Sequence, residues 1–504
     1  MSSSDEMSVD SQTPHDDDDV DQPGTKLRVS FVLSPSVRNN RQQLELPSDP
    51  MAVPCNIRKR GLSAIVNHLL DRGDKDDDDD DDDSASDDDD RLPAIPFDFL
   101  LNDKLLRLPL DSAARNMGLS TEQALELHYF PARLPPKKEG ESEQLPDWIM
   151  VMDYQGQNNR LFTGGADGVI RTFEQVAKSD GGELKGGCSI SAHTGPIKCV
   201  SSLASSSSTM AYVATGSMDQ TLVTHAYDSQ TDKLNLHAVY SGGHSNSISS
   251  VALVGDGSED GKRIMASGDW DGGLAIWNVP GVNTADGTNN NDDTSSKSSK
   301  KRKDNNSNST TTTTTNGAIQ EVQPIQSIRA HSSNISGLAW GYNPGSSSVP
   351  TTLLTGSWDH GLKVYDTTRM DCILALNGSR VVTSLSRCSN SDVVATGSPD
   401  CTVRLWDMRT NGGGTSSGSQ IADKTLRQSH KSWVSAIQWS PTDPFVLATT
   451  SHDGTLKVWD IRSSLPLHTV KATAGKGDKS LCLAFGDGYI YSGGSDCVVK
   501  KFAL

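Results

Sequence analysis

Aspartate, histidine and hydroxyl side chains recur together along the second part of this 504-residue chain. A histidine held between a carboxylate and a serine or threonine is the arrangement that activates the nucleophile of many hydrolases. Four polar loops carry such a histidine, followed by hydroxyl residues and a turn aspartate; these are His193, His244, His331 and His430. Because the set repeats along the chain, the pattern favours a structural role in a repeated fold over a single catalytic centre.

The aspartates occupy corresponding positions in seven copies of one sequence unit. In the copy Leu447–Asp460, two segments are joined by an Asp453-Gly454 turn, which is typical of a β-hairpin. The seven turn aspartates are Asp167, Asp219, Asp271, Asp359, Asp400, Asp453 and Asp496. Six positions after each stands an aromatic residue or a histidine: Phe173, His225, Trp277, Tyr365, Trp406, Trp459 and Phe502. Consecutive aspartates are 41 to 53 residues apart, except for one interval of 88.

This unit resembles the WD repeat, in which each copy forms one blade of a β-propeller. The resemblance covers residues 147–504 and predicts a mainly β protein with a seven-bladed WD-repeat propeller. In the most complete copy we expect a hydrogen-bonded set of His430, Asp453, Trp459 and either Thr449 or Ser451, which ties the loop to the hairpin. The first, fifth and seventh copies lack the loop histidine.

Charge and cysteine content narrow the class of protein. The formal net charge is −18, and the aspartate runs 16–19, 76–83 and 87–90 supply sixteen acids, so the rest of the chain is nearly neutral. No large basic field for nucleic acid is visible, and direct RNA contact stays open. The eight cysteines form no CxxC pair, and we find neither a signal peptide nor an apolar run of membrane length, which indicates reduced, buried, intracellular thiols. Without a nucleotide loop or a metal-ligand cluster, we expect no enzyme activity and no cofactor of its own.

The residues before the repeats divide into a tail and a small domain. Residues 1–25 predict a disordered acidic tail. Residues 26–130 contain strand patterns around an amphipathic helix, an order that suggests a β-grasp sheet. Within this domain, the aspartate-rich residues 74–91 predict a disordered insertion.

The segments GLSAIVNHLL, FDFLL, LLR and GLSTE with LELHY resemble the ubiquitin-like (Notchless-like) domain that precedes a propeller in ribosome-assembly proteins. With seven repeats behind this domain, the chain is identified as a member of the ribosome-biogenesis WD-repeat proteins of the pescadillo–Bop–WD complex. The resemblance implies that the ubiquitin-like domain docks on the adhesion site of midasin, an AAA ATPase. It also implies that one Glu of the domain completes the magnesium shell of that partner.

The matching residue in this sequence is Glu122, and it ends the motif formed by Gly118, Leu119, Ser120, Thr121 and Glu122. A carboxylate suits a hard cation such as magnesium. Two alternatives need no partner. One is a solvated surface carboxylate, and the other is a helix capping box formed by Ser120 and Gln123.

Two further segments carry specific expectations. Residues 131–146 predict a linker and a possible closing strand, because the last copy stops short of a fourth strand, and we expect Leu125–Leu134 or its neighbours to pair with the Cys497–Phe502 strand. The low-complexity residues 281–317 predict a disordered insertion in the propeller. Its basic cluster suggests a nuclear localisation signal, with a merely solubilising loop as the alternative. The cluster consists of Lys297, Lys300, Lys301, Arg302 and Lys303.

For function, the resemblance implies a non-enzymatic scaffold in nucleolar maturation of the large (60S) ribosomal subunit and processing of the 5.8S and 25S/28S rRNA precursors. The implied partners are a Bop-type WD-repeat protein bound by the propeller, pescadillo through that protein, midasin and the 66S pre-ribosome, with no membrane. Midasin would release the protein from the pre-ribosome, with magnesium only at that interface. The implied locations are nucleus, nucleolus and nucleoplasm. The alternative is a generic WD-repeat adaptor, such as a ubiquitin-ligase substrate receptor.

Overall fold

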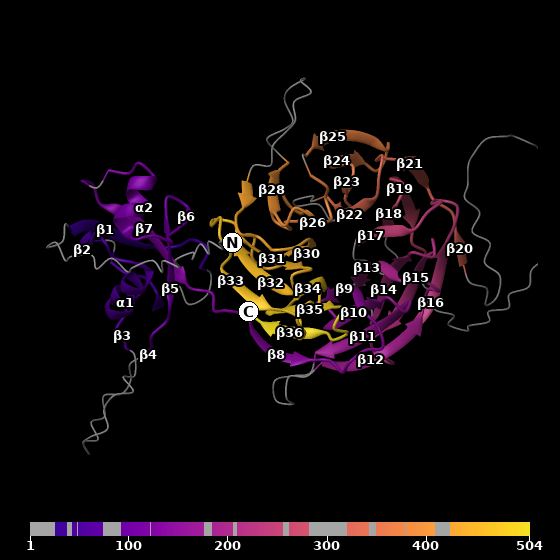
Figure 1. Cartoon of the computed structure of the whole chain (residues 1–504), viewed down its shortest axis with the longest axis horizontal. Helices are drawn as coiled ribbons and strands as arrows, with labels where there is room; N and C mark the ends of the chain where they lie inside the picture. The colour runs from indigo at the N-terminus through magenta and orange to yellow at the C-terminus, as the bar shows by residue number, and fades with distance from the viewer. Residues whose placement is uncertain are drawn as a thin grey trace, which may run out of the picture. The chain divides into compact units, whose positions relative to one another are not determined.

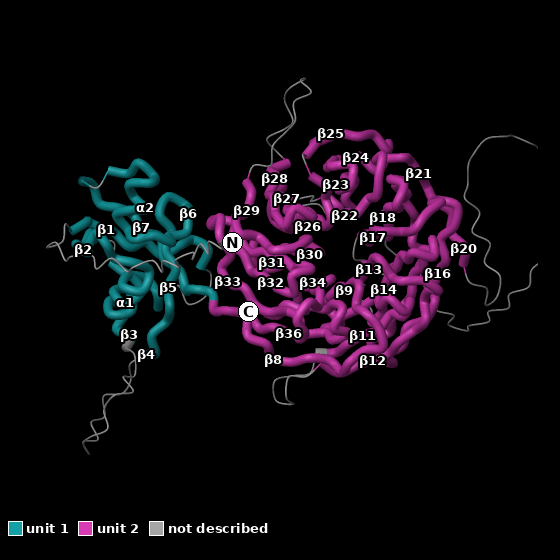
Figure 2. The backbone as a smooth tube through the Cα atoms, in the orientation of Figure 1, with its two compact units in different colours: residues 1–133 teal, residues 134–504 magenta. Residues whose placement is uncertain are grey.

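The computed structural model describes residues 26–37, 43–47, 49–73, 92–120, 122–175, 184–204, 209–255, 262–281, 320–341, 349–378, 380–408 and 424–504. The chain forms two compact units, residues 1–133 and residues 134–504 (Figure 2). Among the described residues, no helix is long and apolar enough to cross a membrane. The expected tail 1–25, the insertion 74–91, Thr121, and residues 282–317 with their basic cluster lie outside the described residues.

The first unit is a five-stranded sheet in the order β2-β1-β7-β5-β6, with a parallel β1–β7 pair in the middle. Its elements are β1 (Lys26–Leu33), β2 (Met51–Pro54), α1 (Lys59–Leu69), β3 (Arg72–Gly73), β4 (Leu92–Pro93), β5 (Phe97–Leu101), β6 (Lys104–Leu105), α2 (Leu110–Asn116) and β7 (Leu125–Pro131). Phe31, Phe99 and Tyr129 pack with Leu62 and Val66 of α1 in one buried core. This arrangement confirms the β-grasp interpretation.

The second unit consists of seven sheets that follow one another around a ring (Figure 1). The first four blades, each from its innermost strand outward, are β9 (Ile149–Gln155), β10 (Arg160–Gly165), β11 (Val169–Gln175) and β12 (Leu184–Ser191); β13 (Ile197–Ala204), β14 (Met210–Ser217), β15 (Leu222–Asp228) and β16 (Lys233–Tyr240); β17 (Ile248–Gly255), β18 (Arg263–Asp269), β19 (Gly273–Asn278) and β21 (Gln326–Arg329); and β22 (Ile335–Trp340), β23 (Thr352–Ser357), β24 (Gly361–Asp366) and β25 (Asp371–Asn377). A short strand, β20 (Gln320–Val322), adds to the outer edge of the second blade in parallel with β16.

The remaining three blades complete the ring. They are β26 (Ser384–Arg387), β27 (Val393–Gly397), β28 (Val403–Asp407) and β29 (Lys424–Leu426); β30 (Val434–Trp439), β31 (Val446–Ser451), β32 (Thr455–Asp460) and β33 (His468–Lys471); and β34 (Ser480–Gly486), β35 (Tyr489–Gly494), β36 (Lys500–Ala503) and β8 (Lys137–Glu141). Ile149 and Met152 of the first blade share one buried cluster with Cys482 and Tyr491 of the seventh, so the two ends of the ring pack together. The mainly β, seven-bladed fold is confirmed.

The strand that closes the seventh blade is β8, which lies within residues 131–146 and neighbours Leu125–Leu134; Leu125–Leu134 itself, the best candidate, was wrong. β8 pairs antiparallel with β36, and just beyond it the Ser142 backbone N–H donates to the Val499 carbonyl at 2.8 Å. Leu125–Pro131 instead forms β7, a central strand of the first unit, because its apolar residues belong to that unit's core. An outer blade strand faces solvent, so the polar sequence KKEGE of β8 carries no apolar alternation to reveal it.

All eight cysteines are free thiols, as their spacing predicted. Most are buried or half-buried, but Cys372 is exposed on the outer strand β25, so the expectation of uniformly buried thiols was wrong there.

Candidate functional site

The motif that precedes Glu122 is anchored by the end of α2. The Leu119 backbone N–H donates to the Ala114 carbonyl and the Gly118 N–H to the Arg115 carbonyl, both at 3.0 Å. These two bonds define a Schellman motif, which needs a left-handed residue after the helix, and Gly118 supplies it with φ of 67°. Leu119 packs against the core of the first unit. The backbone is therefore held up to Leu119, three positions before Glu122.

Glu122 itself lies on the surface, between α2 and β7. Its backbone N–H donates to the Ser120 hydroxyl at 3.3 Å, which closes a local turn. A strand follows this turn, so Ser120 and Gln123 do not form the capping box of a helix. No group of three or more His, Cys, Asp or Glu that could hold a metal ion occurs in the described part of the chain.

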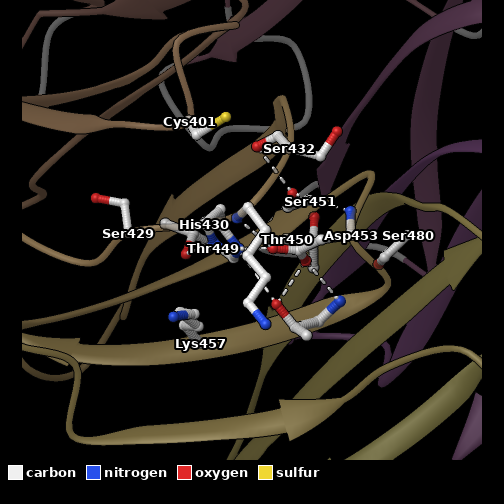
Figure 3. A network of polar contacts seen from close by, with 12 residues as sticks. Cys401, Ser429, His430, Ser432, Thr449, Thr450, Ser451, Asp453, Lys457 and Ser480 are labelled. Atoms are coloured by element: carbon white, nitrogen blue, oxygen red, sulfur yellow. Dashed lines mark hydrogen bonds and ion pairs between the residues drawn. The ribbon is translucent and has the colours of Figure 1, made fainter. Parts of the chain in front are cut away.

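Four blades hold the loop histidine next to a buried hydroxyl, and the sixth blade shows the most complete set (Figure 3). His430 Nδ1 lies 3.2 Å from Asp453 Oδ2, and His430 Nε2 lies 2.8 Å from Thr449 Oγ1. The indole N–H of Trp459 donates to the same Thr449 hydroxyl at 2.9 Å. Of the two candidate hydroxyls, Thr449 therefore joins the set. Ser451 instead accepts the Asp453 backbone N–H at 3.1 Å.

The protonation of this set follows from burial. Burial lowers the pKa of His430 despite the opposing effect of Asp453, so the ring is neutral at neutral pH. Burial alone would raise the pKa of Asp453, but its hydrogen bonds, first that from His430, outweigh this and lower the pKa. His430 Nδ1–H then donates to Asp453, and Nε2 accepts from Thr449. Because Thr449 is 0% exposed, its hydroxyl cannot reach a substrate, and the set acts as a lock between loop and hairpin.

The fourth blade repeats this geometry. His331 Nδ1 lies 2.9 Å from Asp359 Oδ2, and His331 Nε2 lies 2.7 Å from Thr355 Oγ1. Burial opposes ionisation of Asp359, but the Ser332 backbone N–H and the nearby His331 outweigh it and lower the pKa to about 2. Two blades thus share one lock, which is expected of a structural element.

The third blade uses a different carboxylate from the one the repeat pattern indicated. His244 Nδ1 lies 2.9 Å from Asp269 Oδ2, and His244 Nε2 lies 2.6 Å from the Ser267 hydroxyl. The expected partner, Asp271, is exposed. Asp269 stands where other copies have a serine, and like that serine it accepts the N–H of the turn aspartate, at 3.0 Å from Asp271 N. Its carboxylate also reaches the histidine, so Asp271 is not needed in the lock.

The second blade departs from the pattern in two places. His193 Nδ1 lies 2.6 Å from the Thr221 hydroxyl, while Asp219 Oδ1 is 3.4 Å away and accepts from Thr221. At the position of the tryptophan stands His225, which is 1% exposed, and its Nδ1 has no hydrogen-bond partner among the described residues. Burial lowers the pKa of His225 to about 4. This histidine is therefore a neutral core residue.

The three blades without a loop histidine replace it with a cation four residues after the aspartate. These ion pairs are Arg171–Asp167, Arg404–Asp400 and Lys500–Asp496. In the sixth blade, where the histidine is present, the lysine at this position, Lys457, donates to the Gln428 carbonyl at 2.9 Å instead. The sequence shows Arg or Lys at the fourth position after the aspartate in all three of these copies, but also Lys363 and Lys457 in two copies that keep the histidine, so this signal becomes informative only together with the missing histidine.

A matched pair of substitutions tests these assignments. Asp453→Ala should destabilise the propeller by about 1–3 kcal/mol, because it leaves His430 and the Lys431 backbone N–H without their acceptor. Asp271→Ala should change stability by less than about 0.5 kcal/mol, because Asp271 is exposed and His244 bonds elsewhere. Urea unfolding of the full chain measures both. Equal losses would show that Asp271 belongs to the lock after all.

Both units match known protein families. The NLE (NUC135) domain family matches residues 37–114, and the WD domain, G-beta repeat family matches residues 186–223, 236–278, 322–366, 370–407 and 423–460. A protein of Chlamydomonas reinhardtii named "Ribosome biogenesis protein WDR12 homolog" is 30% identical over 495 residues, which cover 95% of this chain and 98% of that protein. The chain belongs to the WDR12 family of ribosome biogenesis proteins. Its similarity extends to an Arabidopsis thaliana WDR12 homolog, 27% identical over 94% of this chain and 95% of the relative. It also extends to "Ribosome biogenesis protein YTM1" of Eremothecium gossypii, 26% identical over 94% and 96%.

Some parts of the chain lie outside the family matches, although the structure gives them the same fold. The five repeat matches leave out the first and last blades, which carry Phe173 and Phe502 where the repeat prefers tryptophan, yet both are complete four-stranded sheets. The domain match ends four residues before Gly118, so Glu122 lies just beyond it. In this member of the WDR12 family, the domain match does not include Glu122, and its role is argued from its geometry.

Proposed function

We propose that this chain is a non-catalytic scaffold in the maturation of the large ribosomal subunit, including the 5.8S and 25S/28S rRNA precursors, and works in the nucleolus and nucleoplasm. In this proposal the propeller binds a Bop-type WD-repeat protein, and pescadillo joins through that partner. Midasin engages the ubiquitin-like unit and removes the chain from the 66S pre-ribosome. The observation that carries the proposal is similarity over almost the whole chain to proteins named for ribosome biogenesis.

The geometry of Glu122 supports the midasin step. The Schellman motif holds the backbone up to Leu119, the Glu122 backbone N–H donates to the Ser120 hydroxyl, and Glu122 is exposed. Magnesium requires near-octahedral oxygen coordination and binds few carboxylates at a time, so one exposed Glu is a suitable sixth ligand for an ion already held by a partner. The chain supplies a single carboxylate here, and the cation belongs to midasin.

Affinity purification of the full chain from nucleolar extract, followed by mass spectrometry, tests the whole proposal. We expect large-subunit precursors, the Bop-type protein, pescadillo and midasin among the recovered proteins. Recovery of ubiquitin-ligase subunits without pre-ribosomal proteins would contradict the proposal and favour a substrate receptor.

Nuclear import offers a separate prediction. Replacing Lys300, Lys301, Arg302 and Lys303 by Ala should move the protein toward the cytoplasm, because a compact basic cluster is what an import receptor recognises. Fluorescence microscopy of the tagged chain measures the distribution. A variant in which the three lysines become Arg keeps the charge and should enter the nucleus normally. Undiminished nuclear accumulation of the Ala variant would contradict the assignment.

A further inference from the structure

The innermost strands of the propeller surround a cavity of about 440 Å³, and the second residue in from the start of each strand lines it. In the third, fourth and sixth blades this residue is Ser, and in the fifth blade Thr383, directly before β26, has the same role; each hydroxyl contacts a backbone carbonyl at the start of the next blade. The donors are Ser249 to Ile335 at 3.2 Å, Ser336 to Val382 at 2.5 Å, Thr383 to Val434 at 2.7 Å and Ser435 to Ser480 at 2.7 Å. These contacts join neighbouring blades, and the Ser249 hydroxyl also lies 2.5 Å from Asn334 Oδ1.

In the second blade the same position holds Lys198, on β13. Its amine forms no hydrogen bond or ion pair with any described residue, and the residues that line the cavity include no Asp or Glu. Burial lowers the pKa of Lys198, which means that the surroundings disfavour the charged ammonium form. A negative charge beside the amine would favour that form again. A half-buried amine without an acid nearby is poorly compensated within the chain. The cavity is therefore electrostatically suited to an anionic group from outside.

Aromatic side chains line the same cavity at one end. The Trp270 backbone N–H donates to the Ser247 carbonyl at 3.0 Å, and the Trp358 N–H donates to the Asn334 carbonyl at 2.9 Å. Ser247 and Asn334 directly precede the innermost strands of the same two blades, so both tryptophans lie where those strands begin. Their rings are 5.1 Å apart. In the sixth blade the His452 N–H donates likewise to the Trp433 carbonyl at 3.0 Å, and the two rings stack at 5.9 Å.

These rings remain accessible. Trp270 is 45% exposed and Trp433 is 47% exposed, although a large aromatic ring on the surface loses the free energy that burial would give. Both line the cavity together with Lys198. One opening thus combines apolar faces with a single positive charge.

We propose that this opening binds an extended acidic segment of a partner protein, in which a carboxylate pairs with Lys198 and a neighbouring aromatic or aliphatic side chain packs on the tryptophans. A cationic ligand would be repelled by the amine. Single-stranded nucleic acid needs a track of several cations along its phosphates, and Lys198 is the one charged residue of the lining. The longest aspartate run of this chain, 76–83, has no aromatic or large aliphatic residue directly beside it to fill the aromatic part. A segment of another protein is the occupant that satisfies both features.

The test is selection of a displayed library of random peptides, about twelve residues long, on the full-length chain. We expect enriched sequences to carry Asp or Glu next to an aromatic or aliphatic residue. A synthetic peptide of the enriched sequence should bind wild type, and its Glu→Gln form should bind about tenfold more weakly. Lys198→Glu should reverse the selection toward basic peptides, and Lys198→Met should remove the charge preference while keeping the side-chain length. Lys233→Glu, an exposed lysine on the outer strand of the same blade, should change nothing.

Several outcomes would overturn the proposal. Enrichment that is the same on wild type and on Lys198→Glu would show that the amine does not select the ligand. Undiminished peptide binding by a Trp270→Ala, Trp433→Ala double variant with unchanged melting would remove the aromatic face from the site. Failure to enrich any sequence, or preference for a random single-stranded RNA oligonucleotide that depends on Lys198, would also overturn it. This proposal is independent of the midasin step, because Glu122 lies in the other unit.

Discussion

Glu122→Gln should weaken binding of this chain to the adhesion domain of midasin by about a hundredfold or more. The substitution keeps the shape of the side chain and removes its charge, and a neutral amide is a poor ligand for a hard dication. Glu122→Asp should fail almost as completely, because shortening the side chain by one methylene withdraws its oxygen from the metal. Pull-down of the adhesion domain with and without EDTA measures both effects.

A matched control separates charge from coordination at this site. Glu126, an exposed carboxylate on β7 in the same unit, should tolerate replacement by Gln without loss of midasin binding. None of these variants should lower the melting temperature, because Glu122 lies on the surface. Binding of the Bop-type partner should persist, since we propose that the propeller binds it. If Glu122→Gln binds like wild type, or if wild-type binding ignores EDTA, Glu122 is not a magnesium ligand.

Local chemistry explains what the sequence could predict. The Asp-Gly turn at Asp453 and the left-handed Gly118 are set by residues within a few positions, so hairpins and the end of α2 could be recognised directly. The fold class followed from repetition of such local units. The exposed position of Glu122 also followed, because the motif stands between a helix end and a strand.

Longer-range choices were not visible in the same way. Asp269 and Asp271 are both acidic and two positions apart, and only the path of the hairpin decides which one meets His244. Outer strands such as β8 face solvent, so their sequence shows no apolar alternation. Lys198 is the single charged residue of β13, and its isolation becomes apparent only when the seven innermost strands are brought together.

The position of β8 has a consequence for the coupling of the two units. Five residues, 132–136, connect β7 of the first unit with β8, which is the outer strand of the seventh blade. A force applied to the ubiquitin-like unit would therefore reach the propeller through the β8–β36 pairing. Ser142 and Leu145 extend this contact along the edge of the blade. The segment that contains β8, Ser142 and Leu145 therefore both closes the ring and links the two units.

Deleting residues 1–145 should destabilise the propeller strongly, whereas deleting residues 1–133 should leave its stability nearly unchanged. The longer deletion removes β8 and the backbone bonds from Ser142 and Leu145 to Val499 and Cys497. At roughly 0.5–1.5 kcal/mol for each lost hydrogen bond, the expected cost is about 3–6 kcal/mol, which corresponds to a melting temperature about 10 °C lower. The newly unpaired edge of β36 should also promote aggregation. Thermal melting and light scattering of the two truncated proteins measure these effects, and equal melting temperatures would show that β8 does not hold the ring closed.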